Sequence, residues 1–344
     1  MSTWGVVLAG GVGSRFWPLS TPSRPKQLLP LVTDAPLLAD AVGRLRPLVD
    51  PKHVLILTNT GLRDAVRRLL PEIPAENVIA EPRAGGTAAA LVWASQEITR
   101  RDGPDAVMIS VHADWAVGDA AAFAATLRAA AVNATKFKSL ITVGVLPTRP
   151  DPGFGYIEPG DELAPGLRRV SRFMEKPDRD RAVSLVNSGC LWNSGIFVWR
   201  VGDFLDDVRR LTPEVARALH AHADDIQGFF REVTPISVDV GVLERSDRVL
   251  VMPGDFAWDD VGTWGALRRV RAHDASGNAV AGKTYAVAAR DNVVHSEGPT
   301  VVLYGVDDLV VVAQDGLLLV TTVDRSADLK SLIDQLPRGV VDRS

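Results

Sequence analysis

Three glycines and two cationic side chains lie close together near the start of the sequence. Gly10, Gly11 and Gly13 follow a short apolar run, and Arg15 and Lys26 come soon after them. Glycine lets backbone N–H groups approach an anion closely, and the two cations neutralise phosphate charge. This combination predicts a site for a phosphorylated ligand. The alternative interpretation is that Arg15 and Lys26 are ordinary solvated surface charges.

Two familiar glycine motifs do not account for this loop. A dinucleotide-binding fingerprint needs a third glycine where Phe16 stands, and a P-loop needs a final Gly-Lys-Ser/Thr that the loop lacks. A complete P-loop spelling occurs later, at 277–284, but it runs into a β-like segment and not into a helix. We therefore interpret 277–284 as a turn.

Strands and helices alternate in the first half of the chain. Short apolar runs predict four buried strands, at 4–9, 53–58, 106–111 and 139–145. Stretches with helical spacing lie between them, at 37–45, 62–69 and 86–100. This alternation favours an α/β fold with a mostly parallel sheet, which binds ligands at the carboxyl ends of its strands.

The pattern changes after about residue 150. Strands and loops at the sheet edge are expected over 151–177, and helices at 178–187, 202–223 and 262–273. After residue 277, short β runs separated by Asp, Asn and Gly predict a small β domain closed by a helix near 326–336. We expect a catalytic domain over 1–275 and a β-rich domain over 276–344.

A series of ordered motifs resembles the signature of the sugar-1-phosphate nucleotidylyltransferases. The segments 16–20 (FWPLS) and 25–29 (PKQLL) are most similar to the mannose-1-phosphate guanylyltransferase subfamily. Further similar segments are Glu81-Pro82, Thr87-Ala88, Ala113-Asp114, 153–158, 173–177, 192–197, Asp239-Val240-Gly241 and 258–264. The resemblance implies a Rossmann-like nucleotidyltransferase domain followed by a short left-handed β-helix.

This resemblance also implies a reaction. GMP would be transferred from GTP to α-D-mannose-1-phosphate, with Mg²⁺ as cofactor and pyrophosphate as the second product. Such a transfer depends on positioning and charge neutralisation more than on a covalent nucleophile. Another sugar-1-phosphate, another base, or a non-catalytic regulatory subunit that senses nucleotide-sugar are the alternatives.

The resemblance assigns roles to individual residues. Arg15 and Lys26 are the expected catalytic residues, and Asp114 and Asp260 the expected metal ligands. The nucleotide side is assigned to Gly10, Gly11, Gly13, Glu81 and Thr87. The sugar-phosphate side is assigned to Gly155, Glu175, Lys176 and Asn193.

Several of these residues have simpler interpretations. Asp114 is also a candidate helix N-cap, and Asp259 is chemically as good a metal ligand as its neighbour Asp260. Glu175 and Lys176 together would also make a surface ion pair. The chain departs from the family pattern at Gly85-Gly86, where relatives carry a basic residue and Asn or Asp. This weakens the inference of guanine specificity unless the bare backbone itself approaches the nucleoside.

Composition excludes several other classes. A net charge of −4 gives no electrostatic footprint for nucleic acid, and a single cysteine excludes a disulfide framework. The sequence shows no membrane-helix run or secretory signal, so we expect a cytoplasmic protein. Exposed edges of the C-terminal β domain predict a homodimer.

Overall fold

The computed structural model describes residues 2–11, 14–314 and 316–341, and its contacts form two compact units. The sheet unit comprises Met1–Gly10, Ala41–His112 and Asp119–Trp258. The coil unit comprises Gly11–Asp40, Ala113–Gly118 and Asp259–Ser344. This division does not fall at residue 275, because segments from three parts of the chain group with the C-terminal strands.

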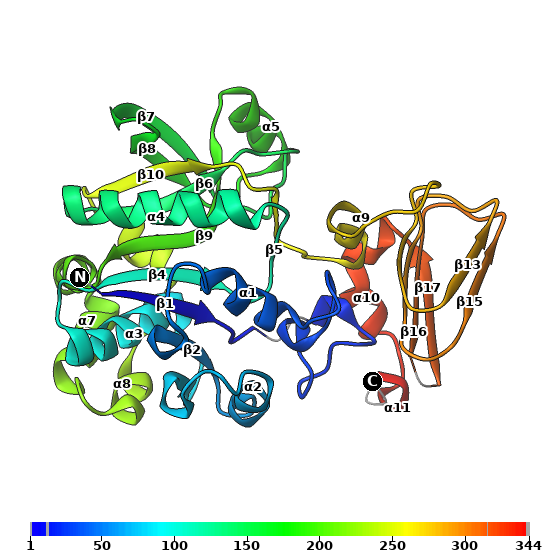
Figure 1. The fold of residues 1–344 in the computed structure, drawn as a ribbon, viewed down its shortest axis with the longest axis horizontal. Coiled ribbons are helices and arrows are strands. Elements are labelled where there is room, and N and C mark those ends of the chain that lie inside the picture. The colour runs from blue at the N-terminus through cyan, green and yellow to red at the C-terminus, as the bar shows by residue number, and fades with distance from the viewer. Residues whose placement is uncertain (1, 12–13, 315, 342–344) are drawn as a thin grey trace. The chain divides into compact units, whose positions relative to one another are not determined.

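A nine-stranded sheet forms the centre of the sheet unit (Figure 1). Its order is β3 (Val78–Glu81), β2 (Val54–Asn59), β1 (Thr3–Leu8), β4 (Val107–His112), β9 (Leu191–Arg200), β6 (Leu140–Val145), β10 (Val249–Gly254), β8 (Leu167–Met174) and β7 (Tyr156–Ala164). Only β9 and β8 oppose the common direction of these nine strands. The prediction of a mixed α/β fold with a mostly parallel sheet is confirmed.

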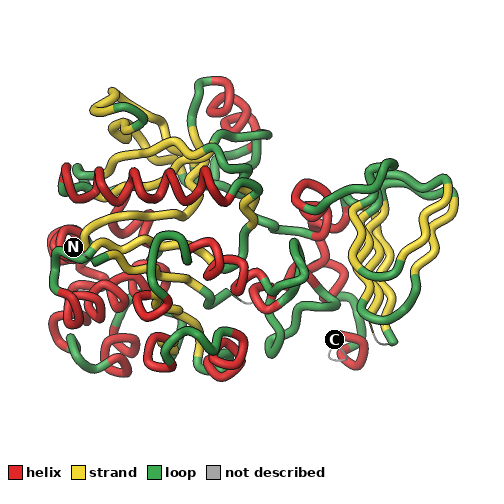
Figure 2. The backbone as a smooth tube through the Cα atoms, in the orientation of Figure 1, coloured by secondary structure: helices red, strands yellow, loops and turns green. Residues whose placement is uncertain are grey.

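Helices cover this sheet along much of its length (Figure 2). They are α1 (Leu37–Leu45), which the unit division splits, and α2 (Arg63–Leu69), α3 (Gly86–Asp102), α4 (Ala120–Phe137), α5 (Arg179–Asn187), α6 (Val201–Leu211), α7 (Pro213–Ala221) and α8 (Ile226–Glu232). On β1, alternate residues face the same side of the sheet: Val6 and Leu8 belong to the cluster that also contains the apolar side of α3. Burial of that side stabilises α3 more than intrinsic helix propensity does.

The predicted elements of the first half are confirmed, and three later ones need correction. The expected helix over 202–223 is two helices, because Pro213 lacks a backbone N–H and starts α7 directly after Thr212. The expected helix over 262–273 shrinks to a 3₁₀ turn (Trp264–Ala266) and α9 (Leu267–Val270). At the chain end, α10 (Leu329–Ile333) is shorter than the expected 326–336, and α11 (Arg338–Val341) follows it.

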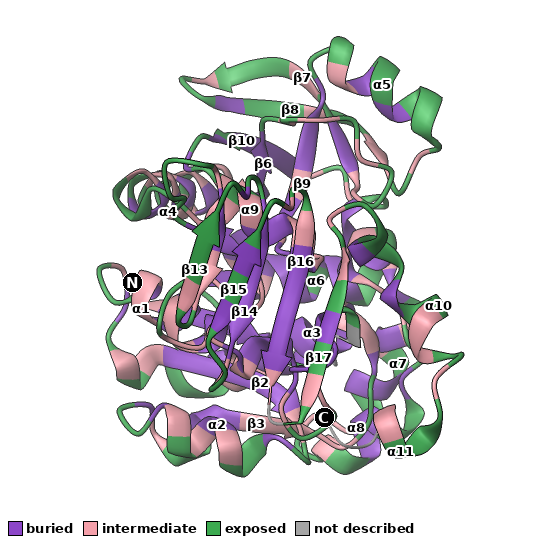
Figure 3. Cartoon of the chain, turned by 90° about the vertical axis from the view of Figure 1, so that its right-hand side faces the viewer, coloured by how far each residue is buried: buried purple, intermediate pink, exposed green. Residues whose placement is uncertain are grey.

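The C-terminal strands stack in parallel coils. In one stack, β12 (Ala279–Ala281), β14 (Val293–Ser296) and β16 (Leu309–Gln314) pair in parallel, and β17 (Leu317–Thr322) pairs antiparallel to β16. In the other, β13 (Thr284–Val287) pairs in parallel with β15 (Val301–Tyr304). Figure 3 shows β16 mainly buried and β13 mainly exposed. The expected C-terminal strand domain is confirmed; the hand of its coils stays a prediction.

Two buried asparagines hold successive coils in register. Asn278 Oδ1 accepts bonds from Asn292 N at 3.0 Å and from Asn292 Nδ2 at 2.9 Å. Asn292 Oδ1 in turn accepts the backbone N–H of Leu309 at 2.9 Å. Both side chains also donate to backbone carbonyls, so the buried ladder satisfies its own polar groups.

The P-loop-like segment is a turn, as the sequence pattern indicates. Gly282 lies between β12 and β13 with a φ of 93°, and a Cβ there would lie 2.3 Å from the carbonyl oxygen of Ser296. The segment opens a strand and not a helix, so it lacks the N-terminal amides that hold phosphate in a P-loop. Among the described residues, no helix combines the length and apolar character needed to cross a membrane.

Candidate functional site

Lys26 is the centre of a charged cluster in the coil unit. It begins a 3₁₀ turn (Lys26–Leu28) and is only 6% exposed. Its Nζ donates to Asp114 Oδ2 at 3.2 Å and to the backbone oxygen of Asp260 at 2.9 Å. A lysine is rarely buried unless it is paired, so these two contacts account for its position. The structure therefore brings together Lys26 and both predicted metal ligands.

Arg15 borders the same cluster through Gly262. A Cβ placed on Gly262 would lie 2.5 Å from Asp260 Oδ2 and 3.6 Å from Arg15 Nη1. A larger residue at 262 would displace the Asp260 carboxylate. Gly262 therefore borders the candidate site, a position that the sequence prediction did not select although it stands within the 258–264 motif.

The structure distinguishes the two neighbouring aspartates. Asp259 is 7% exposed, and its carboxylate accepts bonds from Arg269 Nε at 2.7 Å and Nη2 at 3.0 Å. Asp259 Oδ1 also accepts the backbone N–H of Val261 at 2.9 Å. A carboxylate used in this way has little capacity for a metal ion, so the geometry favours Asp260 as the ligand.

The alternative role of Asp114 as a helix cap is wrong. The N-cap of α4 is Asp119, whose Oδ1 accepts the N–H groups of Ala121 and Ala122. Asp114 precedes it in a loop, with 45% of its side chain exposed, and faces Lys26. Its carboxylate lies on a partly solvated surface, which suits a ligand for a hard divalent cation.

The donor set fits a divalent metal that is shared with a phosphate. Asp114 and Asp260 supply carboxylate oxygens, the ligand type that Mg²⁺ prefers. Within the described ranges, no group of three or more His, Cys, Asp or Glu side chains is arranged to hold a metal. An ion at the two aspartates would therefore complete its coordination with phosphate oxygens and water.

The glycine-rich loop is open at the two positions that the structure describes. A Cβ on Gly10 or Gly11 would meet nothing within 4 Å, and neither residue has a positive φ. Packing thus does not require glycine here, whereas a bare backbone facing open space lets an anion come close. Gln27, 2% exposed, donates from Nε2 to Gly11 O at 2.9 Å and ties the loop to the Lys26 turn. Gly13 lies outside the described residues.

Three predicted sugar-side residues meet in the sheet unit. Asn193 N donates to Gly155 O at 2.9 Å. A Cβ on Gly155 would lie 2.6 Å from Glu175 Oε2, so a larger residue here would displace this carboxylate from its position. Lys176 has a φ of 45°, and its exposed side chain lies 3.2 Å from Glu175 Oε1. The ion pair expected under the simpler interpretation is therefore present. It does not explain why Gly155, Glu175 and Asn193 lie together.

Asp239 is a buried carboxylate that sequence reasoning noticed in a motif but gave no role. It begins a π-helical turn (Asp239–Leu243), a feature frequent at functional sites. Its Oδ1 accepts Asn193 Nδ2 at 2.6 Å, while Thr142 Oγ1 donates to Asn193 Oδ1 at 3.2 Å. Burial raises the pKa of Asp239, an effect that the Asn193 bond opposes and the charge of Glu175 reinforces. The amide of Asn193 is therefore fixed from both ends.

The predicted nucleoside-side residues lie at β3 and the start of α3. Burial at the end of β3 raises the pKa of Glu81 to about 7. Thr87 Oγ1 accepts the backbone N–H of Val238 at 2.9 Å. A Cβ on Gly86, whose φ is 82°, would lie 2.3 Å from Ile236 O. Gly86 thus admits the protein's own backbone at Ile236, and Gly85 makes room for the ring of Phe230, which a Cβ there would approach to 3.0 Å. These contacts are a structural reason for the departure from the family pattern.

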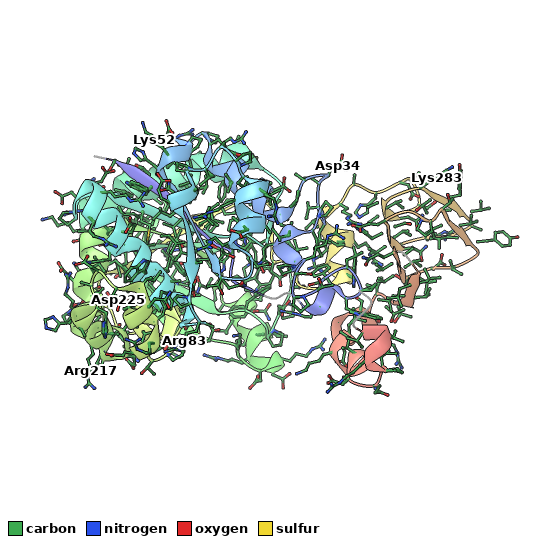
Figure 4. All side chains as sticks on the ribbon, turned by 90° about the horizontal axis from the view of Figure 1, so that it is seen from below. Asp34, Lys52, Arg83, Arg217, Asp225 and Lys283 are labelled. Atoms are coloured by element: carbon green, nitrogen blue, oxygen red, sulfur yellow. The ribbon has the colours of Figure 1, made fainter. Side chains whose placement is uncertain are left out.

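Arg83, on the same segment, is labelled in Figure 4. Its Nη2 donates to the backbone oxygens of Val233 at 2.6 Å and Arg231 at 3.1 Å. These bonds, with the Val238–Thr87 bond, attach the segment after β3 to residues 231–238. The positions of Glu81 and Thr87 therefore depend on a connection far along the chain.

Known proteins resemble this chain over almost its whole length. The family model described as nucleotidyl transferase matches residues 4–277. Mannose-1-phosphate guanylyltransferase RfbM of Salmonella typhimurium is 34% identical, covering 98% of this chain and 73% of the relative. Mannose-1-phosphate guanylyltransferase of Klebsiella pneumoniae is 33% identical, covering 97% and 74%.

Solved structures share the fold. The crystal structure named mannose-1-phosphate geranyltransferase from Thermus thermophilus has a TM-score of 0.91 and 31% identity. The match covers 97% of this chain and 99% of that one. A structure from Bacillus anthracis, named as a putative glucose-1-phosphate thymidylyltransferase, has a TM-score of 0.54 and 22% identity and supports the fold alone. It covers 78% of this chain and 94% of its own.

Proposed function

Because the chain belongs to the nucleotidyl transferase family, we propose that it transfers GMP from GTP to α-D-mannose-1-phosphate. The relatives that match most of its length carry the name mannose-1-phosphate guanylyltransferase. The observation that carries the chemistry is buried Lys26, held between the side chain of Asp114 and the backbone of Asp260. It supports a site built around a phosphate and a cation.

In the proposed reaction, a phosphate oxygen of the sugar phosphate attacks the α-phosphorus of GTP. The new P–O bond forms as the bond to the β-phosphate breaks, so GDP-mannose and pyrophosphate are the products. Arg15 and Lys26 are the proposed catalytic residues, which neutralise charge on the triphosphate. Gly10, Gly11 and Gly13 would donate backbone N–H groups to it.

The family generally uses a divalent metal, and we assign Mg²⁺ here. Asp114 and Asp260 would hold the ion. When bound, it supplies positive charge that neutralises the phosphates and orients them. Lys26 would keep the Asp114 carboxylate in place beside the ion.

The remaining assignments divide between the two substrates. Glu81 and Thr87 are proposed for the nucleoside; the Thr87 hydroxyl accepts the Val238 N–H and keeps its own O–H as a donor. The sugar phosphate is assigned to Gly155, Glu175, Lys176 and Asn193. The exposed ammonium of Lys176 suits a phosphate, and the Glu175 carboxylate and Asn193 amide suit sugar hydroxyls.

We also propose that two copies associate through the C-terminal coils. Exposed apolar residues pair across β13 and β15, Tyr285 with Val302 and Val287 with Tyr304. Such a continuous apolar face is what a self-complementary dimer buries. Light scattering at micromolar concentration tests this: a monomer mass would contradict it.

We place the protein in the cytoplasm, because the proposed substrates, GTP and mannose-1-phosphate, are cytoplasmic metabolites.

Pyrophosphate release with Mg²⁺, measured over a grid of nucleoside triphosphates and sugar-1-phosphates, tests the function. We expect strong release with GTP and mannose-1-phosphate. Strong release only with another pair of nucleoside triphosphate and sugar-1-phosphate would replace the substrate assignment. Absence of pyrophosphate release with every substrate pair would contradict nucleotidyl transfer itself.

A further inference from the structure

The loop that carries Lys26 is attached by a bidentate ion pair to the stacked C-terminal strands β12 to β17 and their turns, which we call the C-terminal coil or the coil. Arg24 Nη1 donates to Glu297 Oε2 at 2.8 Å, and Arg24 Nη2 donates to Glu297 Oε1 at 2.7 Å. Glu297 follows β14, and its own N–H donates to Ala313 O of β16 at 2.8 Å. Bidentate guanidinium–carboxylate pairs fix orientation as well as distance. The coil thus holds Arg24 in one defined position.

A second arginine attaches the other end of the same loop. Arg271 is 8% exposed; its Nε donates to Leu31 O at 2.6 Å, and its Nη2 bonds to His295 Nδ1 at 2.8 Å. His295 is a buried residue of β14. The loop is therefore attached to β14 after Lys26 and to the residue directly following β14 before it.

The loop between these two attachments also packs against the coil. Leu29 and Leu31 are fully buried in one apolar cluster with Val293 and Val310. A cleft of about 580 Å³ opens only at the far end of the loop, where Pro30 and Val32 line it. Apolar packing is non-directional, so the bidentate pair at Arg24 is what orients the polar segment that leads into Lys26.

We propose that Glu297, in the C-terminal coil, is a positioning residue for Lys26 and acts through Arg24. Only Pro25 separates Arg24 from Lys26, and its ring restricts the backbone between them. Arg24 is further fixed by a reciprocal turn with Thr21, in which Arg24 N donates to Thr21 O at 3.1 Å. The coil is then part of the catalytic apparatus. This inference rests on the proposed role of Lys26 in nucleotidyl transfer.

The test compares Glu297→Gln, which removes the charge and keeps the size, with Asp308→Asn. Asp308 is a matched control on the same coil, because it pairs with Arg268 at 2.7 Å and not with the Lys26 loop. We expect Glu297→Gln to lower kcat/KM for GTP about tenfold, as lost positioning does, with KM for the sugar phosphate unchanged. Asp308→Asn should keep wild-type kinetics.

A charge swap separates positioning from folding. Arg24→Glu combined with Glu297→Arg should recover most of the kcat/KM that either single change loses. Wild-type kinetics for Glu297→Gln would overturn the proposal. Equal losses for both substrates together with a matching fall in Tm would also overturn it, because that pattern indicates a structural role only.

A second readout does not depend on the reaction. Labelling by an amine-reactive ester, followed by mass spectrometry, reports the accessibility of each lysine. Lys26 is buried and Lys283 (labelled in Figure 4) is exposed. We expect Lys26 to label several-fold faster in Glu297→Gln, with Lys283 unchanged. An unchanged Lys26 rate overturns the positioning role, whereas absence of activity in the wild type counts only against the proposed function.

Discussion

The ammonium of Lys26 lies 3.2 Å from a carboxylate oxygen of Asp114, although 88 residues separate them in the sequence. Lys26 is buried, whereas nearly half of the Asp114 side chain is exposed. One partner is therefore fixed by the protein and the other faces solvent, where a ligand has access. A cation that entered this site would meet a carboxylate whose orientation is already set by Lys26.

Lys26→Met should reduce pyrophosphate release strongly. The change removes the positive charge from a site where preorganised charge stabilises the transition state, and we expect kcat to fall about a hundredfold or more. Asp114 also loses its ion pair, so its preferred orientation is lost. The measurement is steady-state pyrophosphate release with each substrate varied. Lys283→Met, on an exposed lysine of the coil, is the control. Turnover within about threefold of wild type would contradict the assignment.

Asp260→Asn should raise the Mg²⁺ concentration needed for half-maximal rate, because an amide is a weaker ligand than a carboxylate. Asp259→Asn is the matched comparison: it disturbs the pair with Arg269 and should lower Tm while keeping the Mg²⁺ requirement. Rates measured against Mg²⁺ for both variants decide between the neighbours. If Asp259→Asn alone shifted the Mg²⁺ curve, the two roles would have to be exchanged.

Much of the fold follows from local sequence pattern, and the site does so only in part. The glycines of the first loop, with Arg15 and Lys26, predict a phosphate site through residue type and proximity in sequence. The contact of Lys26 with Asp260 joins residues 234 apart, a distance that no local pattern encodes. Likewise the role of Gly262 becomes visible only where the Asp260 carboxylate occupies its side-chain space.

Errors in the predicted elements have similar causes. Pro213 carried a readable signal for the break between α6 and α7, since a proline starts helices and disfavours a helical residue before it. The apolar run 196–199 is typical of a strand, but no local pattern shows that β9 pairs antiparallel with both β4 and β6, which are distant in sequence. The buried state of Asp239 is also a tertiary property.

Glu81 should make stability depend on pH. Its pKa is raised from 4.5 to about 7 by burial, so between these values the folded state binds more protons than the unfolded state. The free energy of unfolding therefore falls as pH rises through this window and levels off above it. Glu81→Gln should flatten the dependence of Tm on pH there. Glu76→Gln, at an exposed position, should leave it intact. Equal slopes in wild type and Glu81→Gln would contradict the burial argument.

Thr142→Val tests whether the fixed orientation of Asn193 serves the sugar. The substitution keeps the shape of a fully buried side chain and removes the hydroxyl that donates to Asn193 Oδ1. Asn193 would still donate to Asp239 at its other end, so the fold should survive, but its amide plane would be less restricted. We expect KM for mannose-1-phosphate to rise about three- to tenfold, the range for loss of one hydrogen bond, with KM for GTP unchanged.

The control for this change is Thr126→Val. Thr126 Oγ1 donates to a backbone carbonyl of α4, so its replacement removes a hydroxyl bond of the same sheet unit without touching Asn193. Steady-state kinetics with each substrate varied in turn measure both variants. A rise in KM for GTP in place of the sugar phosphate would mean that Asn193 belongs to the nucleotide side. Unchanged kinetics in Thr142→Val would contradict a role of the Thr142 hydroxyl, because the Asp239 bond and the Gly195 N–H, which donates to Asn193 Oδ1 at 3.3 Å, would then orient the amide without it.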